Sequence, residues 1–116
     1  MEMIELILQL KEQYRLKIAV INNEGQELNE YRIKKFQLNR FVDFFIFSCF
    51  VHFRKPDADI FRLALDIAQI QAKHAVYIEY MQLFADIASN LGIRSIQHKN
   101  YLSTSAALAT MGLTIG

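Results

Sequence analysis

The sequence predicts an α/β fold with three layers, in which a parallel sheet of about four strands is flanked by helices. Two observations predict it. Short apolar runs alternate along the chain with helical patterns of 10–15 residues, and this alternation implies parallel strands joined by right-handed crossovers. The strand-like runs are also solidly apolar instead of alternating with polar residues, as expected for strands that helices cover on both faces.

The first half of the chain is expected to hold two helices and two strands. Residues 2–14 carry apolar side chains at helical spacing over a wide arc. "LKIAVI" at 16–21 is a β-branched run of strand length. "EGQELNEYRIKKFQL" at 24–38 mixes apolar and charged residues as a helix does, and "FFIFSCF" at 44–50 predicts the second strand.

The second half repeats this alternation. Pro56 favours the start of a helix, where its missing N–H leaves no bond unmade. An apolar stripe predicts another helix that ends before Gly92, a natural residue for the position after a helix. The elements expected are a helix at 57–70, strands at 75–78 and 94–98, and a last helix at 103–111.

Composition excludes several classes of protein. The 116 residues suit one domain, and 53% hydrophobic with 22% charged residues is ordinary for a globular protein. A formal charge of +1 implies no nucleic acid partner. No apolar run reaches the length of a membrane helix, and the N-terminus lacks the pattern of a signal peptide. The single Cys49 fits a reducing compartment, so a cytoplasmic location is expected.

Polar residues follow each predicted strand, where ligands bind in open parallel sheets. They lie at Asn22 and Asn23, in the loop 48–55, at Glu79 and Tyr80, and at 98–100. A strand-end amide, a loop lysine and a strand-end carboxylate together could hold a phosphate and a divalent cation.

Three stretches carry a resemblance to a known family. They are "KIAVINNEGQELNEYRIKKFQL", "SCFVHFRKPDADIFRLAL" and "VYIEYMQLFADIASNLGIRSIQHKN". In order and spacing they resemble the C-terminal half of a haloacid dehalogenase-like (HAD) hydrolase over nearly the whole chain. The Arg-Lys-Pro-Asp at 54–57 is the most specific element, and the strand, acid and helix ending in Asn-Leu-Gly at 90–92 support it. The resemblance implies a Rossmann-like sheet.

Such enzymes, mostly phosphatases, use four motifs. A strand-end Asp-x-Asp supplies the nucleophile and an acid/base, a strand-end Ser or Thr binds the phosphate, a lysine balances its charge, and an acidic pair holds magnesium. The resemblance places the hydroxyl position on Asn22, followed by Asn23, and the lysine on Lys55. The acidic pair falls on Glu79 and Tyr80, so one acid gains a methylene and the other is lost.

The first motif is absent, together with its strand and any cap domain, so we expect one partial core domain over residues 1–116. In the family's sheet this strand lies between those matching 16–21 and 75–78. Its absence leaves two strand edges to be paired directly, by another chain, or by a second copy. Seven of the nine Phe, at 36, 41, 44, 45, 47, 50 and 53, lie close together in the sequence, and several are expected in the core. Phe50 and Phe53, at or past a strand end, suggest a covered surface or interface. We expect a homodimer or a heteromer.

Each candidate residue also has a structural interpretation. Asn22 is suited to a turn, Lys55 to a solvated loop, and Glu79 to a salt bridge, with Lys55 as one partner. Asp57 and Asp59 have Asp-x-Asp spacing, but they open a helix, where carboxylates meet the favourable end of its dipole. The three histidines lack ligand spacing, and Cys49 is interpreted as a small core residue.

Two functional hypotheses follow. The first is a non-catalytic HAD-like interaction or structural module, because the nucleophile, the hydroxyl and one acid are all missing. The second is one half of a split phosphatase completed by a chain that carries Asp-x-Asp, and only this alternative requires magnesium. A truncated gene product without a selected role is a third possibility. The sequence names no substrate, partner or pathway.

Overall fold

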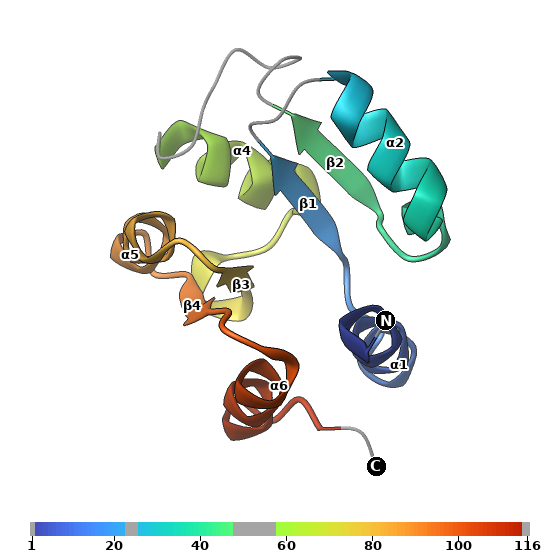
Figure 1. Ribbon diagram of the computed structural model, residues 1–116. Helices are drawn as coiled ribbons and strands as arrows, with labels where there is room; N and C mark the ends of the chain where they lie inside the picture. The colour runs from blue at the N-terminus through green and yellow to red at the C-terminus, as the bar shows by residue number, and fades with distance from the viewer. Residues whose placement is uncertain (1, 23–25, 48–57, 115–116) are drawn as a thin grey trace. The chain divides into compact units, whose positions relative to one another are not determined.

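The computed structural model describes residues 2–22, 26–47 and 58–114, which form helices and short parallel strands (Figure 1). The predicted α/β class is confirmed. These residues divide into two compact units, Lys17–Gln69 and the pair of segments Met1–Leu16 and Ile70–Gly116. Each unit contains one β-α-β arrangement, in which a helix connects two parallel strands.

The unit Lys17–Gln69 pairs its two strands in parallel, with Ala19 opposite Phe44 and Asn22 opposite Phe47. Figure 1 shows the two strands side by side. Its elements are strand β1 (Ala19–Asn22), helix α2 (Gln26–Phe36), the 3₁₀ turn η1 (Leu38–Arg40), strand β2 (Phe44–Phe47) and helix α4 (Ala58–Ala68).

The buried apolar residues of this unit come from the segment before β2, from β2 and from α4. Ile46, Ile60 and Phe61 are each at most 1% exposed, and the others are Phe41, Val42 and Ala68. At the other end of α4, the Lys17 ammonium donates a hydrogen bond to the Ala68 carbonyl at 3.0 Å. The ammonium there pairs with a carbonyl of the last helical turn, which has no partner within the helix. Its positive charge also interacts favourably with the negative end of the helix dipole.

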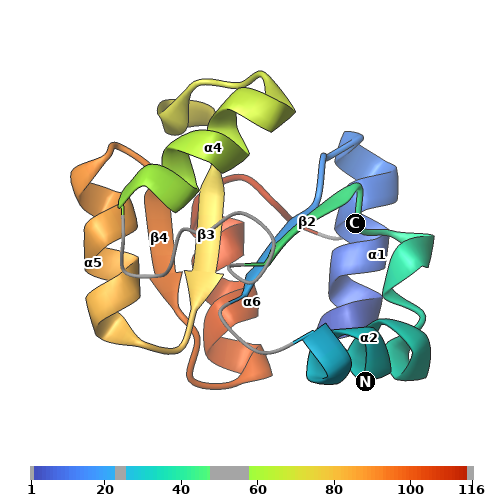
Figure 2. The same ribbon diagram turned by 90° about the horizontal axis from the view of Figure 1, so that it is seen from above.

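The second unit also contains a parallel pair, with Val76 opposite Arg94 and Glu79 opposite Gln97. Its elements are helix α1 (Glu2–Tyr14), the 3₁₀ turn η2 (Ala72–His74), strand β3 (Val76–Glu79), helix α5 (Gln82–Asn90), strand β4 (Arg94–Gln97) and helix α6 (Tyr101–Thr110). Figures 1 and 2 show β3 beside β4, and in Figure 1 α5 and α6 lie on opposite sides of this pair.

Glycines end two helices of this unit. Gly92 follows α5 with φ +89°, and Gly112 follows α6 with φ +87°. After α5, the Ile93 N–H donates to the Ala88 carbonyl at 3.2 Å and the Gly92 N–H to Ser89 at 2.9 Å, the two bonds of a Schellman motif. The predicted role of Gly92 is therefore confirmed.

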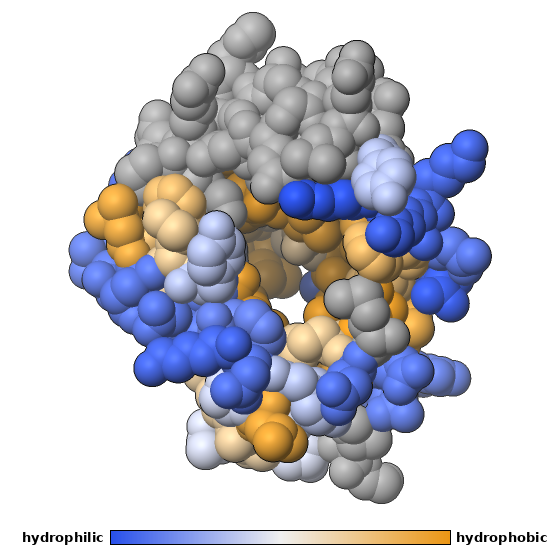
Figure 3. Space-filling view, in the orientation of Figure 1, coloured by the Kyte–Doolittle hydropathy of each residue, from blue (hydrophilic) through white to orange (hydrophobic). Residues whose placement is uncertain are grey.

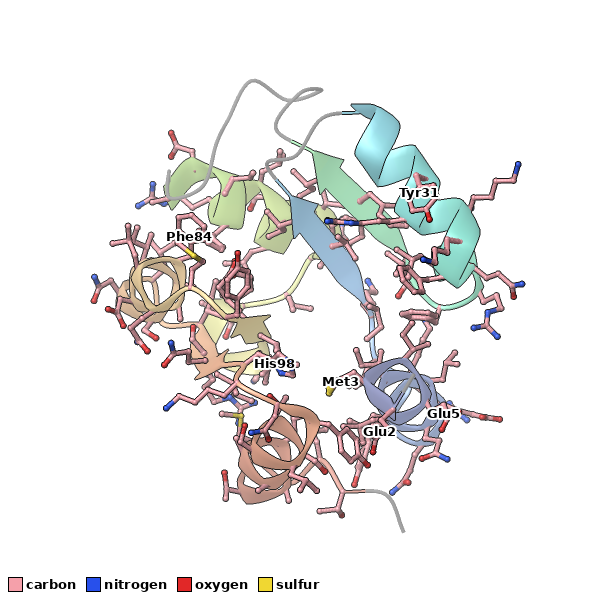
Figure 4. All side chains as sticks on the ribbon, viewed as in Figure 1. Glu2, Met3, Glu5, Tyr31, Phe84 and His98 are labelled. Atoms are coloured by element: carbon pink, nitrogen blue, oxygen red, sulfur yellow. The ribbon has the colours of Figure 1, made fainter. Side chains whose placement is uncertain are left out.

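The core of the second unit lies between α1, α6 and the strand pair. Leu6, Leu10, Ile96 and Leu108 form a buried cluster against which Val76, Ile78 and other apolar side chains pack. In Figure 4, Met3 and Glu5 project to different sides of α1; Met3 packs against the cluster, whereas Glu5 is exposed. Part of the wide apolar arc predicted for α1 therefore packs within its own unit.

Some boundaries differ from the prediction. The first strand begins at Ala19 rather than at 16, and the last helix begins at Tyr101 rather than at 103. The earlier start follows from Asn100, whose side-chain oxygen accepts the Ser103 N–H at 2.8 Å in a capping box. Residues 48–50 of the second predicted strand lie outside the described residues.

The four described strands form two sheets of two strands each. This arrangement differs from a single four-stranded sheet. None of the described helices is long and apolar enough to cross a membrane.

Two leucines of α6 provide a test of the core. Leu108 is 3% exposed and Leu102 is 76% exposed. We expect Leu108→Ala to lower the free energy of unfolding by about 2–5 kcal/mol, because it leaves a cavity. Leu102→Ala should change it by less than about 0.5 kcal/mol. Urea denaturation followed by circular dichroism measures both, and equal effects would show that α6 is packed differently.

Candidate functional site

The candidate site lies at the carboxyl end of β3. Glu79, the last residue of the strand, is only 8% exposed. Tyr80 follows it and is 69% exposed. Alternation along a strand sends neighbouring side chains to opposite faces, and the two positions at which the resemblance expects an acidic pair hold one buried carboxylate and one exposed phenol.

Both oxygens of the Glu79 carboxylate accept hydrogen bonds. The Tyr77 hydroxyl donates to Oε1 at 2.5 Å, and the Met81 N–H donates to Oε2 at 3.2 Å. Tyr77 stands two residues earlier on the same strand, which places it on the same face as Glu79. Met81 is the residue before α5. These hydrogen bonds of Glu79 therefore stabilise the turn that leads from β3 into α5.

The surroundings of the Tyr77 hydroxyl make it a weaker acid. Its burial, followed by its hydrogen bond to Glu79 and the charge of that carboxylate, raises the pKa of Tyr77 well above its usual value of about 10. The phenol therefore remains a neutral donor at physiological pH. It stabilises the buried carboxylate without adding charge.

Hydrogen bonds also connect the end of β4 to the end of β3. The His98 N–H donates to the Glu79 carbonyl at 2.7 Å, which extends the strand ladder by one bond. His98 Nδ1 lies 2.6 Å from the hydroxyl of Thr104, which is fully buried in α6. The Gln97 amide donates to the Tyr80 carbonyl at 3.3 Å. Figure 4 shows His98 at the end of β4. Hydrogen bonds thus tie the two strand ends and α6 together.

The other predicted site residues are described only in part. Asn22 is the last residue of β1, as predicted for a strand-end amide. Asn23 and Lys55 lie outside the described residues, so the predicted pair of Lys55 and Glu79 is not tested. Asp59 lies in the first turn of α4, where its carboxylate pairs with Arg62 at 2.9 Å. This supports the interpretation of Asp59 as a helix-start residue.

A magnesium ion is implied by the family, and we asked whether the residues present would suit it. Magnesium prefers near-octahedral coordination, with one or two carboxylates and further oxygen ligands. Within 2–22, 26–47 and 58–114, no group of three or more His, Cys, Asp or Glu side chains could hold a metal ion. Glu79 alone, buried and hydrogen-bonded on both oxygens, does not make such a site.

Tyr77 was not predicted as part of the site. The signal was available, because a tyrosine two residues before a strand-end acid shares its face and its hydroxyl is a donor. The sequence alone drew attention to Lys55 as the partner of Glu79, since opposite charges are the more obvious pair.

Comparison with known proteins decides the family. The family model for haloacid dehalogenase-like hydrolases matches residues 1–97. The chain belongs to this family. The resemblance seen in the sequence is thereby confirmed, and no curated protein matches the chain.

Solved structures agree with this HAD fold. A HAD family enzyme from Bacteroides thetaiotaomicron in complex with magnesium is 20% identical, with a TM-score of 0.71 over 84% of this chain and 52% of that one. A hydrolase from Streptococcus pneumoniae is 12% identical, with a TM-score of 0.79 over 90% and 54%. An uncharacterised protein from Corynebacterium glutamicum is 17% identical, with a TM-score of 0.77 over 94% and 82%.

These similarities establish the HAD-like, Rossmann-like fold. The chain spans about half the length of the first two structures. The magnesium belongs to the enzyme from Bacteroides thetaiotaomicron and makes this ion plausible for the family. It does not identify a cofactor of this chain.

The hydrogen bond between Tyr77 and Glu79 can be tested by one substitution. Tyr77→Phe leaves an oxygen of a buried carboxylate without this donor, so we expect the free energy of unfolding to fall by about 1–3 kcal/mol. Tyr80→Phe, at the exposed neighbouring position, should change it by less than about 0.5 kcal/mol. Chemical denaturation at pH 7 measures both values. Equal losses would mean that the bond contributes nothing specific.

The pKa of Tyr77 also predicts a pH dependence. Because the pKa is raised in the folded state, the unfolded chain releases this proton first as the pH rises above about 10. The stabilisation is therefore complete below that pH and declines above it. We expect the free energy of unfolding to fall more steeply between pH 9.5 and about 11 in the wild type than in Tyr77→Phe. Parallel slopes in the two proteins would contradict the shift.

Proposed function

We propose that this chain is a non-catalytic interaction or structural module built on a HAD-like core. Three departures from the family's pattern support the proposal: residues 1–116 include no Asp-x-Asp at a strand end, Asn22 stands in place of the hydroxyl, and Tyr80 stands in place of an acid. They affect three different steps of the family's chemistry. A single substitution elsewhere in the chain would not restore the family's chemistry.

The observation that carries this proposal is the structural role of Glu79. A metal ligand at a strand end is normally open to the ligand site, whereas Glu79 is buried and accepts hydrogen bonds from Tyr77 and Met81. The carboxylate thereby stabilises the turn from β3 into α5. This stabilising role accounts for an acid at Glu79 although the second acid that the resemblance expects is replaced by Tyr80.

The alternative is one half of a split, magnesium-dependent phosphatase. Lys55 and the acid at Glu79 match the family's motif, and a similar solved structure is a magnesium complex. In that case Asp-x-Asp would come from another polypeptide. Asn22 and Tyr80 weaken this alternative, because the phosphate and the cation would each lack one ligand that the family supplies.

Either proposal includes a partner chain. We propose a homodimer or a heteromer with a cytoplasmic location and no nucleic acid partner. The supporting facts are the two separate strand pairs, the near-neutral charge and the single Cys49. The formal net charge of +1 supports the last point. Outside the grey residues, the part of α2 visible in Figure 3 is mostly hydrophilic.

An activity assay separates the two proposals. The purified chain is incubated with magnesium and a generic phosphomonoester such as p-nitrophenyl phosphate, and phosphate release is compared with that of Lys55→Ala. We expect both rates to equal the buffer rate, because no nucleophile is present. Turnover that Lys55→Ala abolishes would falsify the non-catalytic proposal. Activity that arises only with a second chain bearing Asp-x-Asp would establish the split enzyme.

Magnesium binding gives an independent test without activity. An ion that binds only the folded state raises its melting temperature by mass action. We expect millimolar magnesium to leave the melting temperature unchanged beyond the effect of an equal ionic strength of sodium chloride. A specific rise that disappears in Glu79→Gln would instead assign a metal to this carboxylate and favour the split enzyme.

A further inference from the structure

Helix α1 is far in sequence from the elements that it contacts. The other elements of its unit follow only after Lys17–Gln69. Within the unit, α1 contributes Leu6 and Leu10 to the buried cluster, which it shares with Ile96 of β4 and Leu108 of α6. Non-covalent contacts therefore hold α1 in place against the entropy cost of closing a long connection.

The ends of α1 and α6 have the same backbone motif. The Leu16 N–H and the Leu113 N–H each donate to the carbonyl five residues earlier, at 3.3 and 3.0 Å. The residues before them, Arg15 and Gly112, have positive φ, as in a Schellman motif. Leu16 and Leu113 both pack against the buried cluster. The two helices therefore end at the same apolar cluster.

The Tyr14 hydroxyl connects these two helix ends. It donates to the Thr114 carbonyl at 2.9 Å and accepts the Thr114 N–H at 3.2 Å. One side chain thus bonds both polar backbone groups of one residue, much as a facing residue does in an antiparallel ladder. Tyr14 also packs against the buried cluster, so its hydroxyl is positioned by packing. We call these two hydrogen bonds the Tyr14–Thr114 clasp.

We infer that the Tyr14–Thr114 clasp is a latch on α1, which sets how often this helix separates from β4 and α6. Regions with few buried side chains open locally while the rest of a fold stays intact, and α1 has two, Leu6 and Leu10. Its separation uncovers Ile96, an apolar residue that is otherwise buried. The latch acts in this way whether or not the chain is catalytic.

Hydrogen exchange measured by NMR on the full chain tests the latch. Tyr14→Phe keeps the ring and removes the hydroxyl. We expect the amides of Thr114 and of α1 to exchange about tenfold faster, since tenfold corresponds to about 1.4 kcal/mol, the order of one hydrogen bond. The amides of β1 and β2, in the other unit, should accelerate by less than about twofold.

The matched control is Tyr101→Phe. Tyr101 packs against the same cluster, but its hydroxyl makes no hydrogen bond within 2–22, 26–47 and 58–114. The control removes the same atom from a tyrosine beside the same cluster without removing a bond. We expect the exchange of α1 in Tyr101→Phe to stay within about twofold of the wild type.

Trypsin cleavage gives a second readout. Lys11 lies within α1, so cleavage after it requires this helix to open, whereas Lys34 lies in α2 of the other unit. The cleavage rate follows the population of the open state when opening and closing are fast. Cleavage after Lys11 should be about tenfold faster in Tyr14→Phe, with cleavage after Lys34 unchanged. Thr114→Pro removes only the N–H of the clasp and should give about a threefold increase after Lys11.

Three outcomes would overturn the inference. They are unchanged exchange of α1 in Tyr14→Phe, an equal acceleration of every slow amide in the chain, and an equal effect of Tyr101→Phe on α1. Circular dichroism shows whether each variant is folded, and Thr114→Pro decides the matter if Tyr14→Phe does not fold. The phosphatase assay is independent of these measurements, so failure of the latch and failure of the non-catalytic proposal are distinguished.

Discussion

Parallel pairing governs this structure, because two parallel strands cannot be joined by a tight turn and need a crossover that packs on their sheet. Both units meet this requirement in the same way. Helix α2 connects β1 to β2, and α5 connects β3 to β4. The crossover fixes one neighbour for each strand and leaves the other side of the strand to be satisfied by something else. The ends of the strands, where polar residues gather, are positioned by the same geometry.

The carboxyl end of β3 shows that an acid at a strand end can have a structural role. An acid at the end of a parallel strand is well placed for a cation, yet placement alone does not make a ligand. Glu79 is stabilised by a phenol of its own strand and by the first amide of the following turn. Replacing one partner of such a group leaves buried polarity unsatisfied, which is more damaging than replacing an exposed residue. The hydrogen bonds of Glu79 therefore have a structural role at this turn.

Much of the fold was predictable because its signals are local. The apolar runs before Asn22 and Glu79 marked strands, and Gly92 marked the end of a helix through its positive φ. The start of the last helix was missed because Asn100 caps it through its side chain, a contact that the apolar pattern does not encode. The family followed from motif order, which survives when individual motif residues change.

The candidate site was less predictable. Its sequence positions were found, but the partner of Glu79 was not, because a hydrogen bond depends on which donors share a strand face and not on charge alone. Tyr77 satisfies that geometry, whereas Lys55, Asn23 and Cys49 lie outside the described residues. The division of the strands into two pairs was equally inaccessible to pattern reading, since strand order is a non-local property.

A parallel pair with helices on its two faces, as α5 and α6 flank β3 and β4, still has its two edges. One of them ends naturally in polar β4. The other edge belongs to β3, whose residues "VYIE" are mostly apolar or aromatic, as is usual for strands inside a sheet. Burying backbone groups without partners costs about 1–3 kcal/mol for each, against a total stability of about 5–15 kcal/mol. Covering an apolar strand edge with another strand therefore stabilises a small α/β sheet.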